Sequence, residues 1–131
     1  MIHSLTNKLL AVHDLDIGVF RFYPNLVVSE IREGTVVTFE KALPLFSLGL
    51  EYYDVNTSLV YISDRKNSYS IDPTLHIEAK EIFANLIGYG VVAYNEMSRK
   101  IAVLEQKFVA CPMAVFNSLD EAESWAQSIL K

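Results

Sequence analysis

The feature that most constrains the fold of this chain is the alternation of short apolar runs with segments of helical periodicity. Such runs occupy residues 58–63, 91–94 and 113–116. Each is shorter than a typical helix, and its continuous apolar character is typical of a strand covered on both faces. Between the runs, apolar residues recur every three or four positions. Strands that alternate with helices in this way predict right-handed crossovers and a largely parallel sheet.

The first part of the chain adds an antiparallel hairpin to this pattern. Residues 17–23 are aromatic and β-branched, as strands prefer, and residues 26–31 run back after a turn at Pro24 and Asn25. Residues 36–37 are interpreted as a short extended linker. The predicted fold class is therefore α/β, with the order β-β-α-β-α-β-α-β-α. We expect one domain over residues 1–131, a mixed sheet, and helices packed mainly on one side.

The first two predicted helices have recognisable start signals. Thr38 is expected to cap the first, in which Pro44 should kink the helix or delay its start. Asp72 and Pro73 begin the second as N-cap and first-turn proline, and Gly88 is expected to end it. The residues expected on the inner face of the first helix are Phe39, Ala42, Leu43, Phe46, Leu50 and Tyr53, and those of the second are Leu75, Ala79, Ile82, Phe83 and Leu86.

Two further helices are expected in the last third of the chain. The first covers residues 98–108 and should turn Ile101, Leu104 and Phe108 inward. The second begins at a capping box, in which Ser118 and Glu121 each satisfy the backbone donor of the other.

Composition excludes several classes of function. The chain carries 16 acidic and 11 basic residues, for a net charge of −5, and no clustered basic face, so nucleic-acid binding is not expected. The single cysteine, Cys111, excludes a disulfide within the chain and a zinc-type cysteine set. No apolar run approaches the roughly 18–20 residues of a membrane span, and the first residues do not resemble a secretory signal. A cytoplasmic location is the expectation.

No catalytic residue, metal site or cofactor is predicted. The three histidines are far apart, and His76 is expected on the exposed side of its helix. Cys111 is expected to be a core or near-core thiol, because Pro112 and a buried strand follow it. Residues 88–90 lack the third glycine of a nucleotide-binding loop and precede a strand instead of following one.

The segment from Ser63 to Asp72 is the candidate functional site. It follows a predicted parallel strand, and ligands of open α/β sheets gather at the carboxyl ends of such strands. Its two basic residues and a nearby helix N-terminus are suited to an anion or a phosphorylated side chain. The alternative is a polar surface loop whose hydroxyls cap their own backbone. The candidate partner- or anion-binding residues are Ser63, Asp64, Arg65, Asn67, Ser68, Tyr69, Ser70 and Asp72.

The aromatic residues, 11% of the chain, allow a second hypothesis. Most are expected to fill the core. They could instead line an apolar pocket for a lipid-like ligand, between the sheet and the helices that carry Phe46, Leu50, Phe83 and Phe108. An edge strand left bare by the hairpin could also pair with a second copy of the chain, giving a homodimer.

Two stretches resemble a known family. Residues 60–73 look like the central strand and following loop of small bacterial SpoIIAA-like (STAS-like) proteins, and residues 116–126 resemble their closing strand and helix. The resemblance implies a mixed sheet of four or five strands. In the related antagonist proteins, a hydroxyl at the start of the helix after the central strand is phosphorylated. Ser68 and Ser70 are the nearest hydroxyls before Asp72, and are the candidate phosphorylation sites.

The leading hypothesis is thus a non-enzymatic regulatory module of STAS-like type, whose loop from Ser63 to Asp72 binds a partner protein. A carrier of a small apolar ligand is the alternative. An enzyme ranks third, because the sequence offers no pair of groups suited to acid–base or nucleophilic catalysis.

Overall fold

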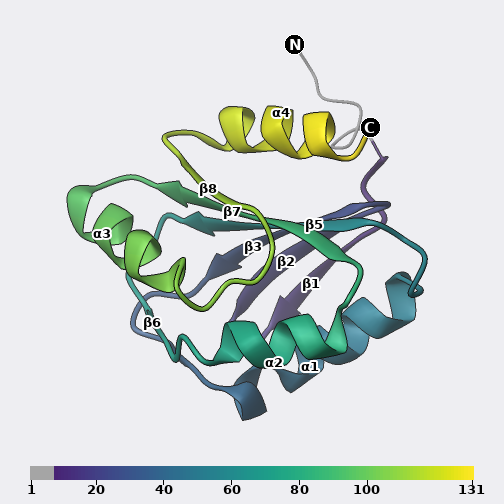
Figure 1. Cartoon of the computed structure of the whole chain (residues 1–131). Coiled ribbons are helices and arrows are strands. Elements are labelled where there is room, and N and C mark those ends of the chain that lie inside the picture. Colours follow the sequence, from purple (N-terminus) through teal and green to yellow (C-terminus); the bar gives the residue numbers. More distant parts are fainter. Residues whose placement is uncertain (1–7) are drawn as a thin grey trace.

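The computed structural model describes residues 8–131 and shows an α/β fold (Figure 1). In this part of the chain it contains four helices and two sheets. The elements are, in order, β1 (Ala11–Leu15), β2 (Gly18–Tyr23), β3 (Leu26–Ile31), β4 (Val36–Val37), α1 (Phe39–Tyr52), β5 (Leu59–Arg65), β6 (Ser70–Ile71), α2 (Leu75–Ile82), β7 (Leu86–Ala93), α3 (Glu96–Glu105), β8 (Met113–Phe116) and α4 (Leu119–Ile129).

The main sheet has six strands in the order β1-β2-β3-β5-β7-β8. The first three form an antiparallel meander, and β5, β7 and β8 join in parallel. The prediction of an α/β fold with a mixed sheet is therefore confirmed, as is the hairpin of residues 17–23 and 26–31. Six strands are more than the four or five that the family resemblance implies.

The helices lie on both faces of this sheet. Helices α1, α2 and α3 cover one face, and α4 lies alone against the other (Figure 1). The core on the first face includes Phe20, Phe22 and Phe46, whereas Val60, Ile62 and Ala126 belong to the core beneath α4. In the central strands β3 and β5, successive apolar side chains alternate between these two cores.

Three strands, β1, β4 and β6, are absent from the sequence-based order. Strand β1 lies at the sheet edge and alternates half-buried with exposed residues, so it lacks the continuous apolar run of a central strand. Strands β4 and β6 have two residues each and pair with one another in parallel. Elements this short show no periodicity in the sequence.

The second helix ends earlier than predicted, because Leu86 and Gly88 belong to β7 and not to α2. Gly88 allows close packing instead of ending a helix. A Cβ at this position would lie 2.5 Å from Ile129 Cδ1 and 3.0 Å from the Trp125 ring. The prediction took the glycine as a helix stop, whereas its physical role is to let α4 approach the sheet.

Helix α1 begins where predicted. The Thr38 side chain accepts a hydrogen bond from the Lys41 backbone N–H at 3.3 Å, and Pro44 lies inside the helix. The inner face is narrower than expected, however, since Leu43 and Leu50 are 43% and 58% exposed. Their expected burial was wrong.

Helix α3 buries a different face from the predicted one. Asn95 caps it, and Ala102 and Glu105 are its buried residues. Ile101 and Leu104, expected inward, are 37% and 60% exposed, and Phe108 lies beyond the helix end. The prediction was wrong because it assumed that the apolar residues of the helix face the interior. Glu105 faces the interior instead, where it pairs with a buried cation, Arg65.

Candidate functional site

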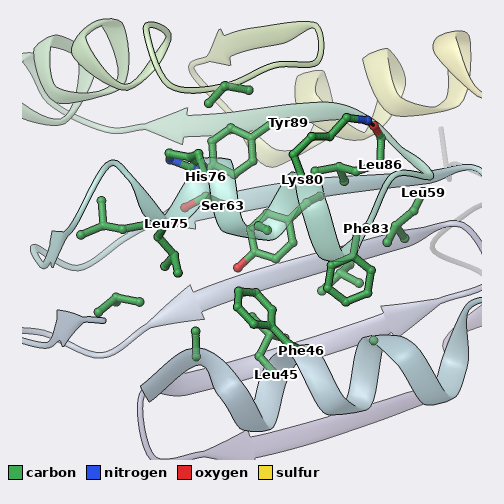
Figure 2. A pocket seen from close by; sticks show the side chains of 18 of the residues that line it. Leu45, Phe46, Leu59, Ser63, Leu75, His76, Lys80, Phe83, Leu86 and Tyr89 are labelled. Carbon is green, nitrogen blue, oxygen red and sulfur yellow. Dashed lines mark hydrogen bonds between the residues drawn. The ribbon is translucent and has the colours of Figure 1, made fainter. Parts of the chain in front are cut away.

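A cavity of about 110 Å³ lies between the main sheet and the two helices α1 and α2 (Figure 2). Its walls are mostly apolar, and the rings of Phe46 and Phe83 meet in it with centroids 5.9 Å apart. Residues 109–111, before β8, close another side. Apolar lining residues used below are Phe46, Ala79, Phe83 and Cys111.

Small side chains on the two helices leave this space. Ala42 and Gly49 face the cavity from α1, and Ala79 faces it from α2. Gly49 also admits the Phe83 ring, since a Cβ there would lie 2.8 Å from Phe83 Cζ. The void is therefore built into the sequence of both helices. Two residues of the predicted apolar pocket, Phe46 and Phe83, do line it.

One end of the cavity is polar. Its lining there consists of Ser63 on β5, Tyr69 before β6, His76 on α2 and Tyr89 on β7. The Ser63 and Tyr69 hydroxyls lie 2.8 Å apart in a hydrogen bond. The His76 ring meets the Tyr89 ring edge-on, with centroids 4.8 Å apart.

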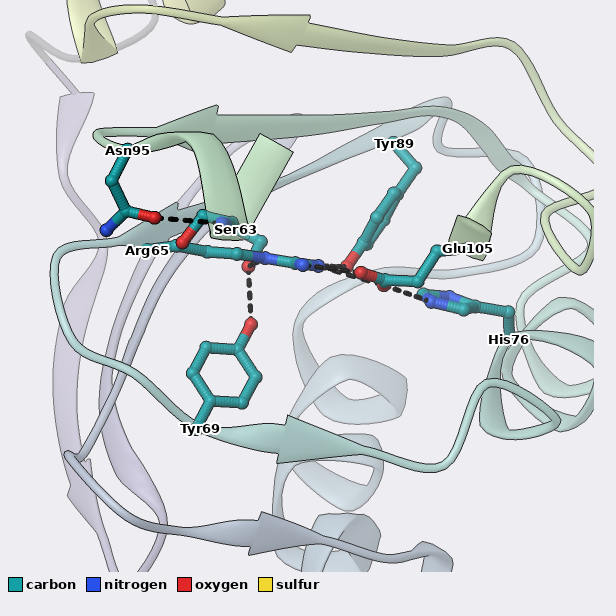
Figure 3. Close-up of polar contacts among 8 residues, drawn as sticks. Ser63, Arg65, Tyr69, His76, Tyr89, Asn95 and Glu105 are labelled. Atoms are coloured by element: carbon teal, nitrogen blue, oxygen red, sulfur yellow. Dashed lines mark hydrogen bonds and ion pairs between the residues drawn. The ribbon is translucent and has the colours of Figure 1, made fainter. Parts of the chain in front are cut away.

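A buried ion pair stands behind this polar end (Figure 3). The Arg65 guanidinium donates two hydrogen bonds to the Glu105 carboxylate, one of them from Nη2 to Oε1 at 2.9 Å. It also donates to Ser63 Oγ at 3.1 Å and to the Tyr89 hydroxyl at 3.0 Å. Arg65 and Glu105 are only 5% and 2% exposed. Arg65 thus donates four hydrogen bonds, which offset the large free-energy cost of burying its charge.

Glu105 joins three elements through this pair. Its carboxylate lies 2.8 Å from His76 Nε2, so the last residue of α3 contacts both α2 and β5. Burial raises the pKa of Glu105, but the hydrogen bonds from His76 and Arg65 more than offset that effect, and the net pKa is lowered. The carboxylate therefore stays ionised and accepts the His76 Nε2 proton.

The tyrosines of the site stay protonated. Burial raises the pKa of Tyr69 and of Tyr89, although the Arg65 charge nearby lowers both in part. Tyr61, which stacks on Tyr89 with ring centroids 5.6 Å apart, also has a raised pKa through burial. Each phenol in the cavity wall is consequently a neutral hydrogen-bonding group at neutral pH.

The segment from Ser63 to Asp72 is not one surface loop. Ser63, Asp64 and Arg65 are the buried last residues of β5, and Ser70 opens β6. Asp72 caps the turn before α2, accepting from the Thr74 backbone N–H at 3.0 Å. The interpretation of Asp64 and Arg65 as loop residues was wrong, because they end β5 and their side chains bond to Tyr94, Tyr89 and Glu105, which are distant in the sequence.

The candidate residues separate into two groups. Ser63 and Tyr69 line the cavity, while a groove of about 220 Å³ on the other side of Tyr69 includes Arg65, Asn67 and Ser68. In the described residues, Asp64, Ser70 and Asp72 line neither space. Other members of the groove are Ile71, Asn95, Met97, Ser98 and Ile101.

Several single-residue contacts complete this region. The Asp64 carboxylate accepts from the Tyr94 hydroxyl at 2.7 Å, and Asn67 Nδ2 donates to the Ile31 carbonyl at 2.9 Å. The Ser68 backbone N–H donates to Glu33 Oε1 at 2.9 Å, while the Ser68 side chain is exposed. These bonds fix the loop between β5 and β6.

His76, Tyr89 and Glu105 were not predicted as site residues. His76 was expected to be exposed, but its side chain is 9% exposed because it packs between Glu105 and Tyr89. No local pattern marks these residues, since their partners are 29 and 40 positions away in the sequence. Helical periodicity places Glu105 on the same face of α3 as the buried Ala102, and this spacing is the signal that could have pointed to a buried glutamate.

Within residues 8–131, no group of three or more histidine, cysteine or acidic side chains is arranged to hold a metal ion. None of the helices in the same range is long and apolar enough to cross a membrane. The Cys111 thiol lies in the cavity wall, half-buried, and burial raises its pKa.

Comparison with known proteins identifies no relative: no family model, curated protein or solved structure matches this chain. The resemblance to SpoIIAA-like proteins stays a prediction.

Proposed function

We propose that this protein is a non-enzymatic binding module that holds a small, mainly apolar molecule in the cavity between the sheet and helices α1 and α2. The cavity carries this proposal. It has a volume of about 110 Å³ and mostly apolar walls, with a few hydroxyl groups at one end. Concave sites with apolar walls and a few convergent polar groups are the usual form of small-ligand sites.

The volume limits the size of the ligand. An engineered apolar cavity of roughly 150 Å³ lined by aliphatic and aromatic side chains binds benzene. A space of about 110 Å³ suits a smaller ring or a short chain. A long acyl chain exceeds this volume, so the proposed ligand is smaller than the lipid-like molecule of the sequence-based hypothesis.

Binding of cyclopentane to the purified protein tests the proposal. A ligand that binds only the folded state raises the unfolding free energy by RT ln(1 + [L]/Kd), which is about 1.4 kcal/mol at ten times Kd. We expect a saturable rise in the thermal midpoint, and changes in NMR resonances confined to cavity residues such as Phe46 and Phe83. Absence of both effects at saturating cyclopentane would contradict the proposal.

A matched pair of variants makes the test specific. Ala79→Leu adds three carbons inside the cavity, whereas Ala84→Leu adds the same atoms at an exposed position outside it. We expect the first variant to lose cyclopentane binding and the second to retain it. Equal binding by both would place the ligand elsewhere.

A second candidate function, the binding of a partner protein, has its own observation. Met97, Ile101 and Leu104 on α3 are 68%, 37% and 60% exposed, and they share one side of the helix. Met97 and Ile101 also line the groove that contains Ser68. Such a surface suits an apolar segment of another protein, and a phosphate on Ser68 would add charge at its edge.

Native mass spectrometry tests this second candidate. We expect a defined complex with the wild-type chain that Ile101→Glu abolishes and Val103→Glu, on a different side of α3, preserves. A protein that carries no partner and no phosphate at Ser68 or Ser70 across growth conditions would contradict it.

A further inference from the structure

We propose that the ligand of the cavity is an uncharged molecule with a carbonyl-type acceptor oxygen, which the hydroxyl protons of Tyr89 and of the Ser63–Tyr69 pair recognise. The inference rests on the proposed function, because it names the chemical class of the molecule bound in the same cavity. It follows from a count of donors and acceptors at the polar end.

Tyr89 presents a buried proton without an acceptor. Its hydroxyl oxygen accepts a hydrogen bond from Arg65 Nη2 at 3.0 Å. A guanidinium has no acceptor atom, so the Tyr89 proton cannot return to Arg65. Among residues 8–131, no hydrogen bond from the Tyr89 hydroxyl to an acceptor is present, although Tyr89 is 6% exposed and lines the cavity.

The Ser63–Tyr69 pair leaves a second proton. Ser63 Oγ accepts from Arg65 Nε at 3.1 Å and shares one hydrogen bond with the Tyr69 hydroxyl at 2.8 Å. Either Ser63 or Tyr69 donates in that bond, and the proton of the other hydroxyl then has no acceptor in the described chain. Both residues line the cavity.

Buried donors without partners are rare in native structures, because each one loses its hydrogen bond to water. Two such protons at one end of an apolar cavity complement a ligand oxygen with two lone pairs. A ketone, aldehyde, ester or amide carbonyl has this acceptor capacity and no proton to compete. A hydrocarbon would leave both donors unsatisfied.

The polar end has no unpaired charged side chain among the described residues, which disfavours an anionic ligand. Arg65 and Glu105 do not line the cavity, and they neutralise each other behind its wall. Lys80 does line it, but its ammonium donates to the carbonyl oxygens of Ala84 and Leu86, at 3.0 and 2.8 Å. A buried carboxylate ligand would face neutral hydroxyls and lack a free cation.

Three ligands of closely similar shape test the inference: cyclopentanone, cyclopentanol and methylenecyclopentane. We expect cyclopentanone to bind about tenfold more tightly than methylenecyclopentane, the ratio for one net hydrogen bond. Cyclopentanol should also bind more tightly than methylenecyclopentane, since its hydroxyl oxygen can accept from the same donors. Equal affinity for the ketone and the hydrocarbon would overturn the inference and leave the proposed function intact. Failure of all three to bind would overturn both.

Variants locate the recognising hydroxyls. Tyr89→Phe and Tyr69→Phe each remove one hydroxyl and keep the ring, and we expect each to narrow the preference for the ketone severalfold. The matched control is Tyr94→Phe, whose hydroxyl contacts Asp64 outside the cavity. An unchanged ketone preference in both cavity variants would contradict the assignment.

A further test uses only the wild-type protein and so does not depend on the folding of any variant. The infrared stretching band of carbonyl-labelled cyclopentanone should shift to lower frequency when bound, relative to the same ketone in a hydrocarbon solvent. A band at the hydrocarbon-solvent position would show that no hydroxyl donates to the carbonyl, and would overturn the inference.

Discussion

Arg65 and Glu105, 40 residues apart in the sequence, form a doubly hydrogen-bonded ion pair in the interior of the protein. The pair joins the end of β5 to the end of α3, and Glu105 extends it to His76 on α2. It also holds the hydroxyls of Ser63 and Tyr89, which line the cavity. One interaction therefore fixes both the packing of α3 and the polar end of the candidate site.

Removal of the carboxylate should destabilise the protein severely. We expect Glu105→Ala to lower the unfolding free energy by about 3–5 kcal/mol, because it leaves the Arg65 charge buried without its partner. Urea denaturation measures the change. The control is Glu96→Ala on the same helix, where the side chain is 82% exposed and lies 3.8 Å from Arg99. A surface pair of that kind contributes at most about 1 kcal/mol. Similar losses in both variants would contradict the role of the buried pair.

Stability should fall in acid through the same residue. The folded-state pKa of Glu105 is below its usual value, so ionised Glu105 stabilises the fold above the unfolded-state pKa. That stabilisation is lost as the pH falls from about 4.5 through the lower folded-state value. The groups that face this carboxylate are Arg65, His76, Tyr69 and Tyr89.

Parallel urea titrations of the wild type and Glu105→Gln measure this effect. The difference in their unfolding free energies should narrow as the pH is lowered from about 6 to about 3, because protonation removes the charge that the variant lacks throughout. A difference that is constant over this range would mean that Glu105 does not respond to acid as its surroundings require.

Gly49 in α1 and Gly88 in β7 should respond differently to substitution by alanine. At Gly49 the new Cβ would meet Phe83, whose ring borders the cavity and has space to shift into. A gain in helix propensity of about 1 kcal/mol should then offset most of the strain. We expect Gly49→Ala to change stability by less than about 1 kcal/mol and to weaken cyclopentane binding.

Gly88→Ala is the contrasting variant. Its Cβ would lie 2.5 Å from Ile129 Cδ1 and 3.0 Å from the Trp125 ring, in the packed layer beneath α4. Overpacking of this kind destabilises by about 1–3 kcal/mol. Thermal unfolding of the two variants checks the comparison. A larger loss for Gly49→Ala than for Gly88→Ala would contradict the presence of free space beside Phe83.

Cys111 provides a reporter of the cavity, since it is the single cysteine of the chain and lies in the cavity wall. Burial raises its pKa, and only the thiolate reacts with disulfide reagents. We expect modification at pH 8 to be slower than in the urea-unfolded protein, and slower still with cyclopentanone bound. A folded-state rate equal to the unfolded one would show that the thiol is not enclosed.

Local sequence patterns predicted most elements correctly where the physical cause is local. The Thr38 cap, the hairpin turn at Pro24 and the Ser118 cap each depend on residues within four positions of one another. The same holds for β8, whose bounds match the predicted strand. Such signals do not require knowledge of the tertiary fold.

The candidate site could not be predicted in the same way. Ser63, Arg65 and Tyr69 are predicted as loop residues after a strand, but Ser63 and Arg65 are buried at the end of β5, and the half-buried Tyr69 lies against the cavity. His76 and Glu105 were missed, because a histidine on a helix is satisfied only by a partner that the fold supplies. Ile101 and Leu104 were predicted to be buried but are exposed, since Glu105 occupies the inner face of α3.

The sequence alone determined the α/β class, because the periods of strands and helices and the caps between them are properties of neighbouring residues. Only the tertiary structure decided where charge and empty space lie. Arg65 and Glu105 meet because α3 packs against β7, the neighbour of β5 in the sheet, and the cavity exists because Ala42, Gly49 and Ala79 face the same region of the sheet. Both features depend on contacts between distant segments, and such contacts leave no periodic signal in the chain.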